Sequence, residues 1–154
     1  RLASQAVIEH FRRREGESLA DFGTGTGVLA LVGLLSGAGT ALGVDVDPRS
    51  VEAARKNAAL NELSERARFV LPEEAPDATF DWVIANVEEP ALLESRARIA
   101  RFVRRDRGRD SVLALTGFLE ERSEVVSAAF EEQGLFVSKR SALDGWALLE
   151  LYVR

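Results

Sequence analysis

Short apolar runs alternate with longer stretches of helical periodicity along most of this 154-residue chain. Runs of about four to eight apolar residues bounded by glycine, proline or charged residues are typical of buried strands, whereas apolar residues three and four positions apart indicate a helix. This pattern predicts strands at residues 18–22, 41–45, 67–71, 80–85, 111–115, 135–139 and 146–153. It predicts helices at residues 2–11, 28–36, 48–60, 90–103 and 120–132.

The order of these elements predicts the fold class. Strands alternate with helices until the last two strands, which follow one another through a turn at Asp144-Gly145. Alternation is typical of parallel strands joined by crossover helices, and two strands joined by a short turn pair antiparallel. We therefore expect an α/β fold, a doubly wound, Rossmann-like, mostly parallel seven-stranded sheet with a C-terminal antiparallel hairpin and helices on both faces. No domain boundary is visible, so residues 1–154 are expected to form a single domain.

Local signals refine a few of these elements. Asp47 followed by Pro48 is a favoured start of a helix, so Asp47 is expected to be a helix cap rather than a ligand. Residues 72–77 read as an acidic, proline-containing loop, and residues 104–110 as a charged turn. His10 is expected on a helix surface, and Trp82 and Trp146 in the core or in strand packing.

Composition excludes several functions. The absence of cysteine rules out disulfides and thiolate metal sites, and a single histidine argues against a His-based metal centre, so no metal is predicted. No apolar run approaches the roughly 18–20 residues that span a bilayer, and no signal peptide is visible; we expect a cytoplasmic protein without membrane contact. The net charge of −5 and the pI near 5.1 weigh against nucleic acid as a partner. No pattern specifies an oligomeric state.

Seven arginines nevertheless gather between residues 96 and 109. A solvated helix face is a commoner explanation for such a cluster than an RNA site. Its members are Arg96, Arg98, Arg101, Arg104, Arg105, Arg107 and Arg109.

The chain contains no methionine, even at position 1, where Arg1 stands. An initiator methionine would normally remain in front of so bulky a residue. We therefore expect the chain to begin inside a longer reading frame.

The strongest chemical signal is the segment Asp21-Phe22-Gly23-Thr24-Gly25-Thr26-Gly27. Alternating glycines let a backbone turn tightly and approach a ligand closely. Asp45 lies about twenty residues further on, at the end of the next predicted strand, where a carboxylate can bind two ribose hydroxyls. The pattern therefore predicts a site for a cofactor that contains a nucleoside.

Two cofactors compete for this site. Gly25-x-Gly27-x-x-Ala30 followed by Asp45 fits a dinucleotide fingerprint, which by itself is a weak signal. S-adenosylmethionine (SAM) instead carries a cationic amino-acid tail and no pyrophosphate. Asp21 at the tip of the first strand suits that tail and would repel a pyrophosphate, so SAM is favoured. The closing hairpin and the short chain favour it too.

The motifs resemble those of the class I methyltransferases, and most of all the ribosomal protein L11 methyltransferase family. The resemblance rests on Asp21 to Ala30, Gly43 to Pro48 and the spacing Ala53-x-x-Asn57-Ala58-x-x-Asn61. Further matches are Val83-Ile84-Ala85-Asn86, Leu113 to Leu119 and Gly145-Trp146-x-Leu148. The resemblance covers nearly the whole chain as the catalytic domain of that family. It implies that a substrate-recognition domain and a segment that closes over SAM would precede Arg1.

The resemblance also implies roles for individual residues. Gly23 would lie against the methionine part of SAM, Asp45 would bind the ribose, and Asn86 would lie near the transferred methyl group. Thr116 would face the same crevice. From the motif and the resemblance together, the residues expected to bind the cofactor are Asp21, Gly23, Thr24, Gly25, Gly27, Asp45, Val46 and Asn86. Those expected to take part in catalysis are Asn86 and, although it departs from the family pattern, Glu88.

One segment departs from the family pattern. Where the family has Asn-Ile-Leu-Ala, this chain has Asn86-Val87-Glu88-Glu89. We hypothesise that Glu88 or Glu89 attracts a cationic lysine of the substrate; both could equally be acids that favour the first turn of a helix.

The function implied by the resemblance is SAM-dependent methylation of a protein amine, with a basic, ribosomal protein as substrate. Two alternatives remain at this point. One is a methyltransferase of the same fold that acts on a small molecule or on RNA. The other is a SAM-binding domain with little activity, because the approach to the methyl group is altered.

Overall fold

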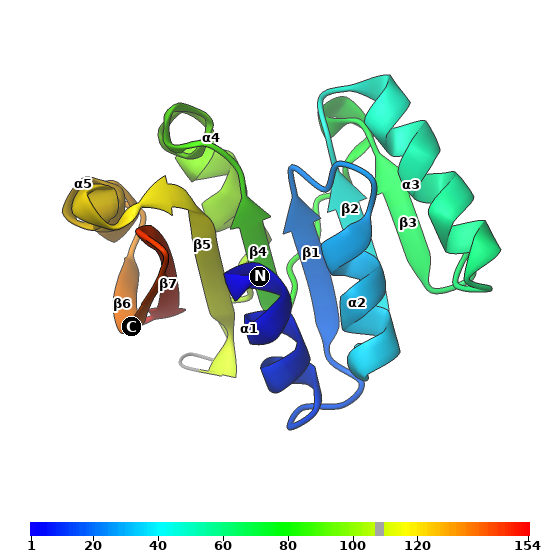
Figure 1. The fold of residues 1–154 in the computed structure, drawn as a ribbon, viewed down its shortest axis with the longest axis horizontal. Helices are drawn as coiled ribbons and strands as arrows, with labels where there is room; N and C mark the ends of the chain where they lie inside the picture. Colours follow the sequence, from blue (N-terminus) through cyan, green and yellow to red (C-terminus); the bar gives the residue numbers. More distant parts are fainter. Residues whose placement is uncertain (107–109) are drawn as a thin grey trace.

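In the part of the chain that the structure describes, seven strands form one sheet at the centre of the molecule (Figure 1). The computed structural model describes residues 1–106 and 110–154. The strand order is β3-β2-β1-β4-β5-β7-β6, with β1 to β5 parallel and β7 antiparallel to both β5 and β6. The strands are β1 (Ser18–Phe22), β2 (Thr40–Val44), β3 (Ala67–Val70), β4 (Trp82–Asn86), β5 (Val112–Leu119), β6 (Leu135–Leu143) and β7 (Trp146–Val153). The predicted fold class is therefore confirmed.

Helices cover both faces of this sheet (Figure 1). The helices are α1 (Leu2–Phe11), α2 (Val28–Ser36), α3 (Pro48–Leu60), α4 (Glu89–Phe102) and α5 (Ser123–Glu131). Side chains of α1, α2 and α3 share one buried cluster with Leu19 of β1, whereas α4 and α5 share another with Ala20 and Phe22 of the same strand. This alternation follows from the two-residue period of a strand, which points successive side chains to opposite faces.

The helix start at Asp47 is confirmed. The Asp47 side chain accepts a hydrogen bond from the Arg49 backbone amide at 2.9 Å, and Pro48 is the first helical residue of α3. Proline fits there because its missing N–H would have had no helical partner.

Several predicted boundaries shift for identifiable reasons. β4 begins at Trp82 rather than at residue 80, because Phe80 forms an isolated bridge with Val103 instead. β5 continues to Leu119 through a bulge between Thr116 and Phe118, since antiparallel pairing with β7 extends it. Pairing with β7 in the same hairpin extends β6 to Leu143, whereas the predicted strand ends at residue 139. The predicted helix 120–132 opens with a 3₁₀ turn, Glu120–Arg122.

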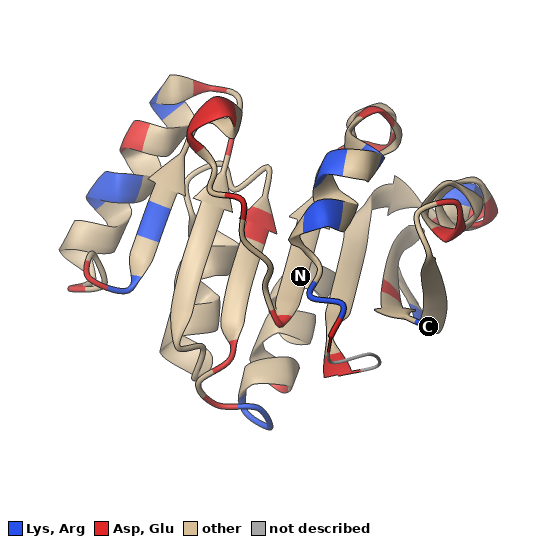
Figure 2. Ribbon diagram, turned by 180° about the vertical axis from the view of Figure 1, so that it is seen from behind, with Lys and Arg blue, Asp and Glu red and all other residues tan. Residues whose placement is uncertain are grey.

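The connection between β3 and β4 contains only a short 3₁₀ turn, Pro72–Glu74. Seen from behind, it crosses the sheet as an extended segment that carries acidic residues (Figure 2). Ala75 and Ala78 pack against the core beneath it, so this thin segment covers the sheet where a helix would otherwise lie.

The expected charged turn 104–110 falls partly outside the described residues, and so do Arg107 and Arg109 of the arginine cluster. Among the described members of the cluster, Arg96 donates to the Leu93 carbonyl within its own helix, and three more make contacts outside it. Arg104 binds Asp81 at 2.6 Å, Arg101 binds Asp77 at 3.3 Å, and Arg105 donates to the Gln133 carbonyl. These three side chains therefore stabilise local structure.

Two predictions about aromatic residues need correction. The His10 side chain is only 14% exposed, because it stacks on Trp82 with ring centroids 5.0 Å apart and bonds Glu17 at 2.8 Å. Trp82 is buried as expected, but Trp146 is 50% exposed, because it begins β7 directly after the turn at the sheet edge.

Candidate functional site

The loops that follow β1, β2, β4 and β5 meet at the carboxyl edge of the sheet (Figure 1). The chain order of the strands reverses between β1 and β4, because β2 and β3 lie on one side of β1 while β4 and β5 lie on the other. Open α/β sheets bind ligands in the crevice at this reversal. All the predicted site residues lie in these loops or at the strand ends that lead into them.

Strand β2 and its loop fasten the glycine loop, residues 23–27. The amides of Gly23 and Thr24 both donate to the Val44 carbonyl, at 2.8 and 3.0 Å. The Gly25 amide donates to Asp45 Oδ2 at 2.8 Å. These bonds give a glycine-rich segment one conformation, which its own residues would not impose.

The three glycines of this loop serve different purposes, although each has a positive φ. A Cβ on Gly23 would clash with Val87, and a Cβ on Gly27 would lie 3.0 Å from both Ala54 and Phe69. A Cβ on Gly25 would meet nothing within 4 Å. Gly23 and Gly27 are therefore required by packing, whereas Gly25 borders open space in which a ligand can lie against the backbone.

Asp21 lies beneath this loop with only 1% of its surface exposed. Its Oδ2 accepts a hydrogen bond from Thr24 Oγ1 at 2.7 Å, while its Oδ1 is buried without a hydrogen-bond partner among the described residues. Burial raises the pKa of this carboxyl to about 6, with the Thr24 hydrogen bond and the backbone of Ala30 opposing the shift. A buried, incompletely bonded carboxylate acts on a ligand through its charge, and it favours a cation.

Asp45 follows β2 and binds two backbone amides. Its Oδ2 accepts from Gly25, and its Oδ1 accepts from Asp47 at 3.0 Å. Each carboxylate oxygen has a second lone pair, so Asp45 can still accept two hydroxyl donors, as a ribose would require. The next residue, Val46, is 77% exposed and offers an apolar surface beside it.

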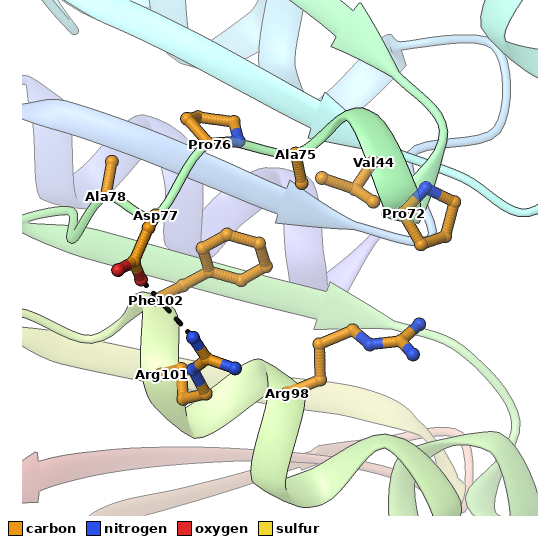
Figure 3. A pocket seen from close by; sticks show the side chains of 9 residues that line it. All are labelled: Val44, Pro72, Ala75, Pro76, Asp77, Ala78, Arg98, Arg101 and Phe102. Atoms are coloured by element: carbon orange, nitrogen blue, oxygen red, sulfur yellow. Dashed lines mark hydrogen bonds and ion pairs between the residues drawn. The ribbon is translucent and has the colours of Figure 1, made fainter.

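A hollow of about 560 Å³ begins at Val46. It is lined by Val46, Pro48, Leu71, Pro72, Glu73 and Arg98. Figure 3 shows an adjoining groove of about 160 Å³ between the β3–β4 connection and α4, which shares Pro72 and Arg98 with it. The Arg101–Asp77 ion pair closes one end of this groove, and the Arg98 side chain extends toward Pro72 at the other (Figure 3). An apolar ring such as a purine would find a suitable surface at Val46.

A second hollow of about 320 Å³ opens beside Asn86, on the β5 side of the reversal. It is lined by Arg1, Leu2, Ala3, Asn86, Thr116, Gly117, Leu143, Asp144 and Trp146. Asn86 is exposed at the end of β4 and pairs in register with Thr116 of β5. The Thr116 hydroxyl donates to the Ala147 carbonyl at 2.6 Å and is buried, so Asn86 is the better placed of the two to bind a ligand.

Val87 holds the end of β4 in place. Its side chain occupies the space that a Cβ on Gly23 would need, and its backbone lies where a Cβ on Gly117 would be. The positions of Asn86 and Glu88 on either side of Val87 therefore depend on two glycines from neighbouring loops.

The two adjacent glutamates differ in environment. Glu89 accepts two hydrogen bonds from Arg122, at 2.6 and 2.7 Å, and this contact lowers the pKa of the Glu89 carboxyl. Glu88 is exposed; its backbone carbonyl accepts from the Leu92 amide, but its carboxylate makes no hydrogen bond or ion pair with a described residue. Arg122 thus compensates the charge of Glu89, while the charge of Glu88 stays available to a partner.

Sequence reasoning missed two residues of this region. Trp146 lines the hollow beside Asn86, and the turn immediately before it is the signal that could have placed it at the sheet edge. Arg122 follows β5 within a charged segment, and nothing in its local sequence indicates the pairing with Glu89, which lies 33 residues away.

Residues 1–106 and 110–154 contain no group of three or more His, Cys, Asp or Glu side chains placed to hold a metal ion. Over the same residues, none of the helices combines the length and apolar character needed to cross a membrane.

Solved structures with this fold include several methyltransferases. The ribosomal protein L11 methylase of Lactobacillus delbrueckii subsp. bulgaricus superposes with a TM-score of 0.84 and 23% identity, covering 99% of this chain and 78% of that one. An RNA methyltransferase from Salinibacter ruber, solved in complex with S-adenosyl-L-homocysteine, superposes with a TM-score of 0.74 and 17% identity, covering 99% of this chain and 91% of that one. The fold is therefore that of the Rossmann-like methyltransferases.

The family follows from sequence. The family model described as ribosomal protein L11 methyltransferase (PrmA) matches residues 4–153, and the chain belongs to this family. A ribosomal protein L11 methyltransferase of Ralstonia pickettii is 42% identical over 150 residues, which are 97% of this chain and 47% of that protein. The chain thus spans about half the length of the curated relatives that it matches. The resemblance drawn from the motifs is confirmed.

The different surroundings of the glycines predict different effects of one added methyl group. Gly25→Ala should fold with a modest loss of stability, about 1 kcal/mol, because φ is +55° there, and it should weaken binding of S-adenosylhomocysteine at least about tenfold. Gly27→Ala should lose more stability, since its Cβ would press on Ala54 and Phe69. Thermal unfolding and calorimetric titration of both variants measure the two effects; undiminished binding by Gly25→Ala would contradict the assignment of Gly25 to a ligand surface.

Asp21→Asn should change the stability of the fold by an amount that depends on pH. The folded pKa of about 6 lies above the ordinary value of 3.8, so the ionised carboxylate destabilises the fold at neutral pH, and this cost disappears as the pH falls toward 4. The amide variant should therefore be more stable than the parent at pH 7.5, by up to about 3 kcal/mol, and the advantage should vanish by pH 4. Denaturant unfolding of both proteins at several pH values measures it. A variant that is less stable at pH 7.5 would show that Asp21 is chiefly a cap of the loop.

Proposed function

We propose that this chain is the catalytic domain of a SAM-dependent methyltransferase that methylates amines of a basic protein, a ribosomal protein by its family. The observation that carries the proposal is the cradle at the strand reversal, where Gly25 borders open space and Asp45 is held beside it. The exposed Asn86 lies across the reversal from this cradle. Relatives named for ribosomal protein L11 support the substrate class. We place this activity in the cytoplasm.

The residues present fit SAM better than a dinucleotide. Asp45 would bind the ribose hydroxyls, and the hollow at Val46 would receive the base. The buried carboxylate of Asp21 suits a cationic amino-acid tail and disfavours a pyrophosphate. Gly23 and Thr24, which are tied to β2, and Gly27 would shape the backbone around the tail.

When bound, SAM supplies an activated methyl group on a sulfonium, whose sulfur leaves as a neutral thioether. The protein then has to position the acceptor and limit its contact with water. Asn86 would orient the acceptor amine through its side-chain oxygen, since a neutral amine donates hydrogen bonds while its lone pair attacks. The hollow that Asn86 shares with Trp146 is large enough to admit a lysine side chain from the β5 side.

Glu88 is the acid proposed to attract the acceptor. Its carboxylate is exposed two residues after Asn86, whereas Glu89 is bound by Arg122. The earlier hypothesis named both glutamates; the ion pair favours Glu88 alone. An unpaired charge at the rim of a site accelerates association with an oppositely charged partner more than it tightens the complex.

The cofactor assignment predicts selective stabilisation. S-adenosylhomocysteine at about 100 times its Kd should raise the melting temperature by about 5–10 °C, whereas NAD should leave it unchanged. Asp45→Ala should abolish the shift, because it removes the ribose acceptor and releases the Gly25 amide. Differential scanning fluorimetry measures this. Stabilisation by NAD alone would favour the dinucleotide alternative. Stabilisation by S-adenosylhomocysteine without any methyl transfer would support the alternative of a SAM-binding domain with little activity.

Glu88→Gln and Glu89→Gln form a matched pair, because each removes one negative charge. Glu88→Gln should raise the KM for bacterial ribosomal protein L11 about three- to tenfold with little change in kcat, and the effect should shrink in high salt. Glu89→Gln should change KM less, since it instead releases Arg122. Transfer of tritiated methyl groups measures both. An equal rise of KM in both variants would mean that only the net charge of the protein matters. An unchanged KM in both variants would contradict the proposed role of Glu88 in attracting the substrate.

A further inference from the structure

The spacing Ala53-x-x-Asn57-Ala58-x-x-Asn61 on α3 has no role in the site as described so far. Ala54 and Ala58 are buried and pack α3 against the core, which explains small residues there. Packing does not explain Asn57, whose side chain is half-buried and polar. The side chain extends away from α3 to the glycine loop, where its Nδ2 donates to the carbonyl of Thr26 at 2.9 Å.

This contact fixes the last peptide of the glycine loop. The Thr26 carbonyl accepts from Asn57, and the Gly27 amide of the same peptide unit donates to the Thr24 carbonyl at 2.9 Å. Both polar groups of the peptide between residues 26 and 27 are therefore bound, one from α3 and one from within the loop. Because a peptide unit is planar, the two bonds together determine its orientation.

The other hydrogen bonds between the loop and distant residues, within the described part of the chain, come from β2 and the residue after it. Val44 and Asp45 hold residues 23 to 25. Thr26 is exposed, and Gly27 begins α2 in a left-handed conformation without a side chain that could cap the helix. Within the described part of the chain, Asn57 is thus the distant side chain that fastens the end of the loop nearest to α2 by a hydrogen bond, beside the packing of Ala54 and Phe69 on Gly27.

We propose that Asn57 is a positioning residue for the cofactor: it holds the Thr26–Gly27 peptide so that the glycine loop is already in its binding conformation before the ligand arrives. It acts through the backbone, and no contact between Asn57 and the cofactor is required. Preorganisation of this kind raises affinity because the ordering of the loop is completed during folding rather than on binding. The inference rests on the proposed function, since it takes the glycine loop to be the SAM site.

Asn61 provides the matched control. It repeats the same spacing one turn later as the C-cap of α3, and its Nδ2 donates to the carbonyl of Asn57 at 2.8 Å, at the C-terminal end of that helix. Asn61→Ala therefore removes a side-chain to backbone hydrogen bond of similar length that does not touch the loop. Any effect shared by the two alanine variants reports on the helix alone.

Calorimetric titration of the chain with S-adenosylhomocysteine tests the proposal. Asn57→Ala should raise the Kd about three- to tenfold, and Asn61→Ala should leave the Kd unchanged. Both variants should lose a similar amount of melting temperature, because each loses one side-chain to backbone hydrogen bond. In a methyl-transfer assay, Asn57→Ala should raise the KM for SAM and leave kcat nearly unchanged. An unchanged Kd in Asn57→Ala, or an equal change in Asn61→Ala, would overturn the proposal.

Asn57→Asp adds a pH readout that a purely structural role would not produce. At pH 8 the introduced carboxylate would face the Thr26 carbonyl as a second acceptor, so the variant should bind less tightly than Asn57→Ala. At pH 4, close to the ordinary pKa of an aspartate, about half of these carboxyls are protonated and donate to that carbonyl, so the Kd relative to the parent protein should recover in part. No recovery relative to the parent would contradict the hydrogen bond as the cause.

Hydrogen exchange of the ligand-free protein separates this proposal from the cofactor assignment. Asn57→Ala should accelerate exchange of the Gly27 amide, and Asn61→Ala should not, as measured by NMR. If the parent protein failed to bind S-adenosylhomocysteine while this difference was present, the proposed function would fail and the tether of the loop would stand. If the Gly27 amide exchanged equally in all three proteins, the tether itself would be wrong.

Discussion

The carboxylate of Asp45 links the two strands on which the site depends. It binds the amide of Gly25 from the loop after β1 and the amide of Asp47 from the start of α3. Together with the Val44 carbonyl and Asn57, this side chain determines how the glycine loop lies relative to β2 and α3. The parallel register of β1 and β2, with Phe22 opposite Val44, brings these loops to the same level of the edge. Without that register the carboxylate could not reach both amides.

Close packing of backbone and side chains imposes the second constraint on this edge. Val87 fits against Gly23 and Gly117, so the loops after β1, β4 and β5 can approach only where side chains are absent. Phe69 makes a similar demand on the other side, because it lies where Cβ atoms on Gly27 and Gly43 would project. The three glycines of the loop thus differ in their surroundings: Gly23 and Gly27 are required by packing, whereas Gly25 borders open space.

Much of this arrangement could be predicted from the sequence, because it depends on local patterns. The alternation of strands and helices, the Asp47-Pro48 helix start and the Asp21 to Gly27 motif are each readable within a short window. What could not be predicted involves contacts between distant segments. The extension of β5 and β6 comes from pairing with β7, the burial of His10 comes from stacking on Trp82, and the exposure of Trp146 comes from its place at the sheet edge. No local pattern contains these partners.

The same distinction explains why the acidic residues of the site cannot be interpreted from their spacing alone. Asp21, Glu88 and Glu89 all carry carboxylates near the strand ends, yet their surroundings differ. Burial raises the pKa of Asp21 to about 6, the Arg122 contact lowers the pKa of Glu89, and Glu88 remains exposed. A buried charge acts on whatever lies in the cradle, a paired charge stabilises the loops, and an exposed charge acts on an approaching partner. The segment that carries Glu88 and Glu89 therefore belongs to the outer surface of the candidate site, while Gly25 and Asp45 form the cradle in which we propose that the cofactor binds.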